Sequence, residues 1–286
     1  MKKINIALFG FGRIGRNIFR LGYDNPRYNF VAISDFGSLE ALHYLLMRDS
    51  VHGSMKDEVI LDGNYLKVKD QKVRVISGGQ PGTIPWDIYD VDIVIDATGR
   101  FLKKSDLAMH LDSGAKKVFT TRNPQEKIDR YVIPGINDLA IDSSDRIIST
   151  TSSTTQVLAL MLKMLDESFG LERAMMTTVH AYTADQPLAD AAGLDLRRSR
   201  SAAENIIPNS TFAPSIVEEI MPKFKGKIDG IAFNVPVPNG SCVDLTTELR
   251  KTPTVEEANH AIKKFSENSL KNIVGYTSDP IVSSDV

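Results

Sequence analysis

Three glycines near the start of the chain have the spacing of a phosphate-binding turn. Gly10, Gly12 and Gly15 fit the pattern G-x-G-x-x-G. The pattern follows Ile4–Phe9, an apolar run that predicts a strand, and it opens Arg13–Leu21, whose apolar positions have helical spacing. Glycines let the backbone approach a pyrophosphate closely, and the unpaired N–H groups of a helix N-terminus bind the anion. This context predicts a dinucleotide site; the alternative is that the glycines only make a tight turn.

A carboxylate follows at the distance that such a site requires. Asp35 lies 20 residues after Gly15, at the end of the next predicted strand, Phe30–Ser34. A carboxylate at this place accepts hydrogen bonds from ribose hydroxyls, and it repels the additional phosphate of NADP. NAD is therefore the expected cofactor.

The segments around these residues alternate between strand and helix patterns. This alternation predicts a Rossmann-type, doubly wound parallel sheet with helices on both faces. An inserted antiparallel hairpin is expected where Asp62-Gly63-Asn64 interrupts two alternating runs. Further expected elements are a helix from Ser38 to about Met47, a buried strand at Val91–Thr98, a helix at Ser105–Leu111, and strands at Lys116–Thr121 and Tyr131–Ile133.

The pattern changes near residue 150, so we expect two domains, at 1–150 and 151–286. The second half carries a Leu- and Met-rich helical pattern that stops at Gly170, a plausible C-cap, and a capping box formed by Thr254 and Glu257. Its expected elements are a helix at Thr155–Ser168, strands at Ala174–His180, Ile231–Val235 and Ser241–Leu249, a helix to about Asn268, and a long loop at Ala181–Pro208.

Composition excludes several classes of protein. The chain has 286 residues, a net charge of −2, 42% hydrophobic residues and 24% charged residues. A dedicated nucleic-acid binder would carry a basic excess, and a disordered chain would be less hydrophobic. The start is interpreted as a strand and not as a signal peptide, and no apolar run approaches the roughly 18 residues of a membrane span. The single cysteine, Cys242, fits a reducing cytoplasm, and no Cys/His cluster has metal-ligand spacing.

Several runs of residues together match the motifs of one enzyme family. They are Phe11–Arg16 (FGRIGR), Asp49–Gly53 (DSVHG), Ala97–Phe101 (ATGRF), Met176–Thr183 (MTTVHAYT) and Val235–Thr246 (VPVPNGSCVDLT). On these runs the chain resembles phosphorylating glyceraldehyde-3-phosphate dehydrogenase over nearly its whole length. The resemblance implies an NAD-binding Rossmann domain, an α+β catalytic-type domain with a largely antiparallel sheet, and a cytoplasmic homo-oligomer, usually a tetramer. Family members also continue beyond the point that resembles Val286, so we expect the family's last strands and final helix to be absent.

The family's reaction, a step of glycolysis, depends on a cysteine and a histidine. The cysteine attacks the aldehyde, the histidine acts as base, hydride passes to NAD, and phosphate releases an acyl phosphate. Ser153 lies in the position of the nucleophile, and His180 lies in the position of the base. A hydroxyl is a weak nucleophile without strong activation, and no third carboxylate can be assigned to orient His180 as in a serine hydrolase. We therefore expect a homologue that binds NAD but is inactive or severely impaired.

Further departures from the family's pattern lie in the substrate and cofactor sites. Asn234 stands where the family has an arginine for the substrate phosphate, and Phe212 replaces a glycine of the inorganic-phosphate site. By resemblance, the remaining phosphate contacts are Ser152, Thr154, Thr183 and Thr211. The remaining NAD contacts are Arg13, Ile14, Thr98, Gly99 and Thr121. Thr121 lies in a run that departs from the family's pattern.

Two other functions stay open. The chain is either an NAD-dependent dehydrogenase for another aldehyde or alcohol, with His180 as base, or an interaction subunit that has lost NAD binding. Expected partners are a phosphorylated small molecule, further copies of the chain or an active paralogue, and neither nucleic acid nor membrane. Outside the motifs, Cys242 is expected in the core, Trp86 in packing, and Arg197, Arg198 and Arg200 at a subunit interface.

Overall fold

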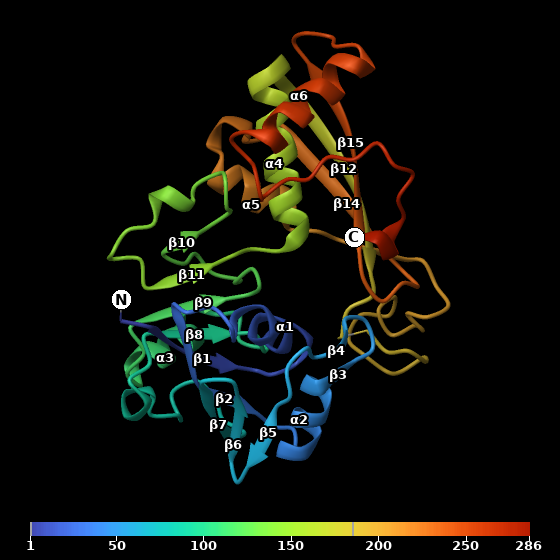
Figure 1. Ribbon diagram of the computed structural model, residues 1–286. Helices are drawn as coiled ribbons and strands as arrows, with labels where there is room; N and C mark the ends of the chain where they lie inside the picture. Colours follow the sequence, from blue (N-terminus) through green and yellow to red (C-terminus); the bar gives the residue numbers. More distant parts are fainter. Residues whose placement is uncertain (1, 185) are drawn as a thin grey trace. The chain divides into compact units, whose positions relative to one another are not determined.

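The computed structural model describes residues 2–184 and 186–286, which form two compact units (Figure 1). The first unit extends to Val132 and includes Ala140–Thr151. The second comprises Ile133–Leu139 and Ser152–Val286. Each unit has its own sheet and its own hydrophobic core, and each is described separately below.

Nine strands in the described part of the first unit form one sheet, in the order β10-β11-β9-β8-β1-β2-β7-β6-β5. Neighbours from β10 through to β7 pair in parallel, whereas β7, β6 and β5 pair antiparallel. The expected Rossmann-type sheet and its inserted hairpin are therefore confirmed. The strands are β1 Ile4–Phe9, β2 Tyr28–Asp35, β5 Ile60–Asp62, β6 Tyr65–Val68, β7 Gln71–Ser77, β8 Ile93–Asp96, β9 Lys117–Thr120, β10 Arg130–Tyr131 and β11 Ile147–Ser149; β3 Arg48–Asp49 and β4 Gly53–Ser54 make a separate pair.

The two faces of this sheet bury different side chains. Leu8 packs with Phe19 in one core, whereas the next residue of β1, Phe9, packs with Trp86 in another. Successive side chains of a strand point to opposite faces, so one strand serves both cores. Trp86 is fully buried in this core, which confirms its predicted role in packing. The helical segments of this unit are α1 Arg13–Gly22, α2 Leu39–Met47, η1 Trp86–Tyr89 and α3 Lys104–Asp112. The short turn η2, Asp138–Ala140, spans the point at which the chain passes from the second unit back to the first.

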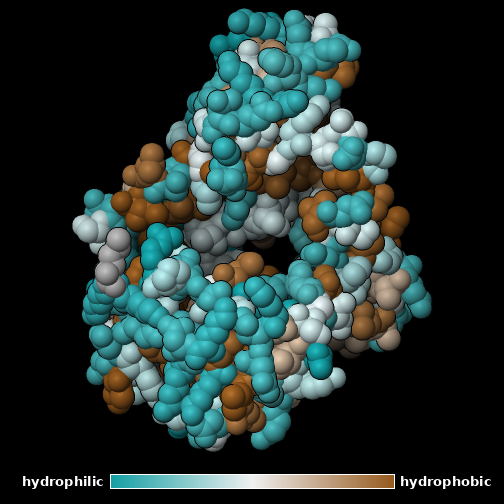
Figure 2. Space-filling view, in the orientation of Figure 1, coloured by the Kyte–Doolittle hydropathy of each residue, from teal (hydrophilic) through white to brown (hydrophobic). Residues whose placement is uncertain are grey.

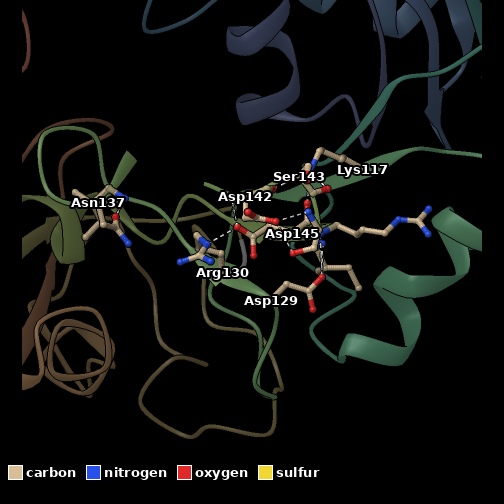
Figure 3. Close-up of polar contacts among 11 residues, drawn as sticks. Lys117, Asp129, Arg130, Asn137, Asp142, Ser143 and Asp145 are labelled. Atoms are coloured by element: carbon tan, nitrogen blue, oxygen red, sulfur yellow. Dashed lines mark hydrogen bonds and ion pairs between the residues drawn. The ribbon is translucent and has the colours of Figure 1, made fainter. Parts of the chain in front are cut away.

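A polar cluster holds the loop before β11 to strands β9 and β10 (Figure 3). The Arg130 guanidinium pairs with Asp145, whose carboxylate also accepts a hydrogen bond from the Asp142 main-chain N–H at 2.8 Å. The Lys117 ammonium donates to main-chain carbonyls of the same loop, among them that of Ser143 at 3.1 Å. The hydrogen bond from Arg130 is the main cause that lowers the pKa of Asp145 below its ordinary value. The loop is thus held to the sheet by ionised groups.

The described part of the second unit has four paired strands, in the order β13-β14-β12-β15. Pairs β12–β15 and β13–β14 are antiparallel and β12–β14 is parallel, so the sheet is largely antiparallel, as expected. Its strands are β12 Leu171–Ala181, β13 Ile207–Asn209, β14 Ile228–Val235 and β15 Ser241–Leu249. Its helical segments are α4 Ser153–Phe169, α5 Ala213–Ile220, η3 Pro222–Phe224, α6 Val255–Glu267 and η4 Ser283–Asp285.

Helix α4 forms the centre of the second core. The Ser152 hydroxyl caps its start by accepting from the Thr155 N–H at 3.2 Å, and Gly170, with φ +74°, ends it. Leu158 and Leu162, on one face of the helix, pack with Met176 of β12. The start and end of this helix agree with the sequence prediction to within two residues.

Three expectations need correction. The strand predicted at Val91–Thr98 ends at Asp96, because the Asp96 carboxylate accepts the Thr98 N–H at 2.9 Å and turns the chain. The strand predicted at Tyr131–Ile133 covers only Arg130–Tyr131. Cys242 is exposed and does not lie in the core. On β15 the residues that join the core are Val243, Leu245 and Leu249, so Cys242 falls on the opposite face by strand alternation.

The visible surface of the first unit is predominantly hydrophilic, with hydrophobic residues in small separate groups (Figure 2). Single exposed apolar side chains such as Leu21 and Ile88 are ordinary for a folded protein. Across residues 2–184 and 186–286, the helices are too short or too polar to cross a membrane.

Candidate functional site

The glycine turn joins β1 to α1. Gly10 has φ +94°, and a Cβ on this residue would lie 2.8 Å from the Thr98 nitrogen. A Cβ on Gly15 would lie 2.2 Å from the Gly10 carbonyl oxygen, so glycine is needed for the helix to approach the strand. Gly12 caps α1 without a side-chain hydrogen bond, and a Cβ there would meet nothing within 4 Å. The turn therefore combines two tight contacts with open space at a helix N-terminus, which is the arrangement that a pyrophosphate requires.

Asp35 ends β2 and is fastened to the glycine turn. One carboxylate oxygen accepts the Phe11 N–H at 2.7 Å, and the other accepts the Gly37 N–H at 2.9 Å. Each carboxylate oxygen can accept a second hydrogen bond, and the side chain is only half-buried. The group is thus oriented by the backbone and still able to bind the hydroxyls of a ribose.

The carboxyl ends of neighbouring parallel strands bring the other predicted cofactor residues to the same edge. Thr98 and Gly99 follow β8, and Thr121 follows β9 with its N–H donating to the Asp96 carbonyl at 3.1 Å. Arg13 and Ile14 open α1, and Ile14 is 48% exposed. Ligands of open α/β sheets bind outside this edge, so the residues present fit NAD.

The start of α4 gathers hydroxyl groups in the second unit. Ser152 is the N-cap, Ser153 is the first helical residue, and Thr154 is the second. Ser153 is exposed, whereas Thr154 is only 7% exposed. A helix of this length presents unpaired N–H groups and a positive dipole end at its N-terminus. This arrangement suits an anion, and it places the Ser153 hydroxyl where it meets solvent.

His180 lies at the far end of β12, which runs back along the unit after α4. The helix is about 25 Å long and the strand about 30 Å to His180, so the connection at Gly170 returns His180 toward the Ser153 end. The Nδ1 atom of His180 bonds the Ala181 carbonyl oxygen at 2.7 Å. A carbonyl only accepts, so Nδ1 carries the proton in the neutral ring and Nε2 keeps its lone pair.

Asn234 is the register partner of His180 on β14, and its amide is used within the sheet. Its nitrogen donates to the Ala181 carbonyl at 3.1 Å, and its oxygen accepts from the Asn209 amide at 3.1 Å. The residue is only 7% exposed. Asn234 therefore shares the carbonyl that orients His180 and has both ends of its amide paired.

The remaining predicted phosphate contacts also have partners within the chain. The Thr183 hydroxyl donates to the Gln186 side-chain oxygen at 3.3 Å, and the Thr211 hydroxyl accepts from the Ala213 N–H at 3.2 Å. Phe212 caps α5 with φ −92°, a conformation that does not require glycine, and its ring is 72% exposed. In the adjoining long loop Arg200 pairs with Asp190 at 2.9 Å.

One polar group of residues was missed by the sequence analysis. Asp96 and His110 are buried side by side in the first unit, and Trp86 donates a hydrogen bond to His110. These residues come from β8, α3 and η1, and no sequence spacing connects them. Burial raises the pKa of Asp96 to about 6 and lowers the pKa of His110 to about 4. No group of His, Cys, Asp and Glu side chains in the described part of the chain could hold a metal ion.

Comparisons with known proteins cover both units. Residues 4–104 match the family described as glyceraldehyde 3-phosphate dehydrogenase, NAD binding domain, and residues 152–286 match its C-terminal domain. Glyceraldehyde-3-phosphate dehydrogenase 1 of Bacillus subtilis is 44% identical over 283 residues, which are 99% of this chain and 84% of that protein. Glyceraldehyde-3-phosphate dehydrogenase 2 of Streptomyces avermitilis is 43% identical over 285 residues, with 99% and 85% covered. The chain therefore belongs to the glyceraldehyde-3-phosphate dehydrogenase family, with NAD as its cofactor.

Proposed function

We propose that this chain binds NAD in its first unit but has lost, or retains only weakly, the covalent chemistry of its family. The proposal rests on Ser153, the exposed first residue of α4, and on the resemblance that assigns this residue to the position of the family's nucleophilic cysteine. A cysteine is partly thiolate near neutral pH, and a helix N-terminus lowers its pKa further. A serine hydroxyl stays protonated there and needs a strong base to react.

The surroundings of Ser153 favour the same conclusion. The Nδ1 atom of His180 is bonded to a main-chain carbonyl, which orients the ring but supplies no negative charge to stabilise an imidazolium. Removing the nucleophile of another enzyme has lowered turnover by about 10⁶. We expect a loss of comparable size here, because His180 remains and the attacking atom does not.

Substrate binding is proposed to be weakened as well. By the resemblance, the contacts that remain for a phosphorylated small molecule are the hydroxyl groups of Ser152, Thr154, Thr183 and Thr211, of which those of Ser152, Thr183 and Thr211 also bond within the chain. By the resemblance, Asn234 occupies the place of a guanidinium, and it offers there a neutral amide whose two ends are already paired within the sheet. A lost charged hydrogen bond costs about 1.5–3 kcal/mol, which is roughly a tenfold to hundredfold loss of affinity.

The decisive experiment compares four proteins in two assays. NAD binding is measured by calorimetry, and NADH formation from glyceraldehyde 3-phosphate and phosphate is followed by absorbance. Wild type and Ser153→Ala are expected to bind NAD and to form almost no NADH. Ser153→Cys is expected to gain activity, whereas the control Ser266→Cys, which places a thiol on α6, is not. Rapid NADH formation by wild type that Ser153→Ala abolishes would refute the proposal.

A second function has one observation in its favour. The tautomer of His180 leaves Nε2 able to accept a proton, so the ring can act as a base without a covalent intermediate. A dehydrogenase for another aldehyde or alcohol would then transfer hydride to NAD in Ser153→Ala but not in His180→Asn. A protein that showed no heat of binding at millimolar NAD would instead support an interaction subunit, in a homo-oligomer or with an active paralogue.

A further inference from the structure

A line of three buried polar side chains lies behind the cofactor edge of the first unit. The Trp86 indole Nε1 donates to His110 Nδ1 at 3.1 Å. On the other side of the ring, His110 Nε2 lies 4.0 Å from Asp96 Oδ2. The second carboxylate oxygen of Asp96, Oδ1, accepts the Thr98 N–H at 2.9 Å and the Thr98 hydroxyl at 2.6 Å. Exposure of His110 is 0% and of Asp96 is 2%, so both side chains are shielded from bulk solvent.

The indole determines which ring nitrogen of His110 carries the proton. An indole N–H only donates, so Nδ1 must accept and Nε2 carries the hydrogen in the neutral ring. Nε2 is the ring nitrogen that lies 4.0 Å from Asp96 Oδ2. Among the described residues neither His110 Nε2 nor Asp96 Oδ2 has a hydrogen-bond partner, and the 4.0 Å between them is longer than a hydrogen bond. A buried N–H donor beside a buried carboxylate oxygen is an attractive arrangement when the carboxylate is ionised.

Only one protonation state avoids setting one donor against another along the line. A proton added to Asp96 Oδ2 would set an O–H against the N–H of His110, and a proton added to His110 Nδ1 would set an N–H against the indole of Trp86. Burial raises the pKa of Asp96 to about 6, although its two hydrogen bonds from Thr98 oppose the shift. Burial lowers the pKa of His110 to about 4. The proton taken up as the pH falls through 6 therefore goes to Asp96.

The neighbouring elements add no charge to this pair. The register partner of Asp96 on β1 is Phe9, and its register partner on β9 is Thr120. The Phe9 ring also meets the His110 ring edge-on, with centroids 4.6 Å apart. The pKa of Asp96 is shifted by its burial and by the hydrogen bonds from Thr98, and the pKa of His110 is shifted by its burial alone. No charged group of the described chain contributes to either shift.

We propose that Asp96 is a positioning residue for the NAD site, and that Trp86 and His110 keep it in the ionised form that holds Thr98 in place. The Thr98 backbone packs against Gly10 so closely that a Cβ on Gly10 would lie 2.8 Å from the Thr98 nitrogen. Protonation of Asp96 weakens the two hydrogen bonds that Oδ1 accepts from Thr98. Thr98 is then held less firmly against Gly10. NAD affinity then falls in mild acid. The inference rests on the proposed assignment of Thr98 and Gly10 to the NAD site.

The first test measures the NAD dissociation constant by calorimetry between pH 5.0 and pH 7.5. If only the ionised form holds the turn, the constant rises by up to about tenfold for each pH unit below the pKa, so wild type binds about tenfold more weakly at pH 5 than at pH 7. Asp96→Asn is expected to bind NAD weakly, with the same dissociation constant at pH 5.0 and at pH 7.5. Asp92→Asn, which removes a carboxylate just before the same strand, is expected to keep the wild-type profile. A flat profile in wild type, or an unchanged one in Asp96→Asn, would overturn the inference.

The second test needs no ligand. Trp86 is the only tryptophan of the chain, so a ¹⁵N-labelled sample gives a single indole N–H resonance, and that N–H belongs to the line itself. We expect this resonance to titrate with a midpoint near pH 6 in wild type and to lose that midpoint in Asp96→Asn. A resonance that does not move between pH 5 and pH 7.5 would overturn the inference even if the Asp96 variant failed to fold. Absence of NAD binding by wild type at pH 7.5 would instead refute the NAD site, and the positioning role with it.

Discussion

Gly10→Ala and Gly12→Ala separate stability from cofactor binding within a single turn. Gly10 has φ +94°, and an added Cβ would lie 2.8 Å from the Thr98 nitrogen and 2.9 Å from its Cα. The backbone conformation alone costs a non-glycine residue about 1–2 kcal/mol, and the clash with a neighbouring backbone adds about 1–3 kcal/mol. Gly12 has φ −71° and nothing within 4 Å of its Cβ position. Alanine there costs less than about 1 kcal/mol, as a poorer N-cap.

The assay is thermal unfolding with and without NAD, followed by far-UV circular dichroism. Each kcal/mol shifts Tm by about 2–4 °C at this size, so Gly10→Ala is expected to lower Tm by about 4–20 °C and Gly12→Ala by at most about 4 °C. NAD at 100 times its Kd stabilises wild type by about 2.7 kcal/mol. Gly12→Ala should lose most of that shift, because its methyl group enters the space that a phosphate approaches. A Tm of Gly10→Ala within about 2 °C of wild type would refute the reasoning.

Three further predictions follow from packing, capping and charge. Leu158→Ala, on the buried face of α4, should lower the free energy of unfolding by about 2–5 kcal/mol, whereas Val157→Ala, at an exposed neighbouring position, should change it little; denaturant titration compares the two variants. Thr254→Ala removes the capping box of α6 and should cost about 1 kcal/mol by the same measurement. Arg130 lowers the pKa of Asp145, so the ionised Asp145 carboxylate stabilises the folded protein above about pH 4. This contribution is lost as the pH falls through the folded-state pKa of Asp145. Asp145→Asn should therefore be less stable than wild type at pH 6 and converge with it near pH 2, as acid titrations of stability would show.

Local patterns predicted the parts of the fold that depend on neighbours in the sequence. The Asp62-Gly63-Asn64 turn, the capped start of α4 and the capping box of α6 each depend on residues within a few positions of one another. The glycine turn was predictable for the same reason. Strand ends were less predictable, because β8 ends where the Asp96 side chain bonds its own backbone, and β-propensity alone does not detect that bond.

Features that depend on distant residues were not predictable from one sequence. Cys242 has the character of a core residue, but its place on one face of an edge strand decides that it is exposed. The pairing of Asn234 with Asn209 and with the carbonyl beside His180 required the register of three strands. The line of Trp86, His110 and Asp96 joins segments that only the folded sheet brings together.

The placement of the two rarest side chains gives the protein a built-in distance probe. Its single tryptophan, Trp86, is buried in the first unit, and its single cysteine, Cys242, is exposed in the second. One maleimide-linked energy-transfer acceptor at Cys242 would therefore make a unique donor–acceptor pair with the indole, without any substitution. The transfer efficiency in wild-type protein would then report directly on whether NAD draws the two units together.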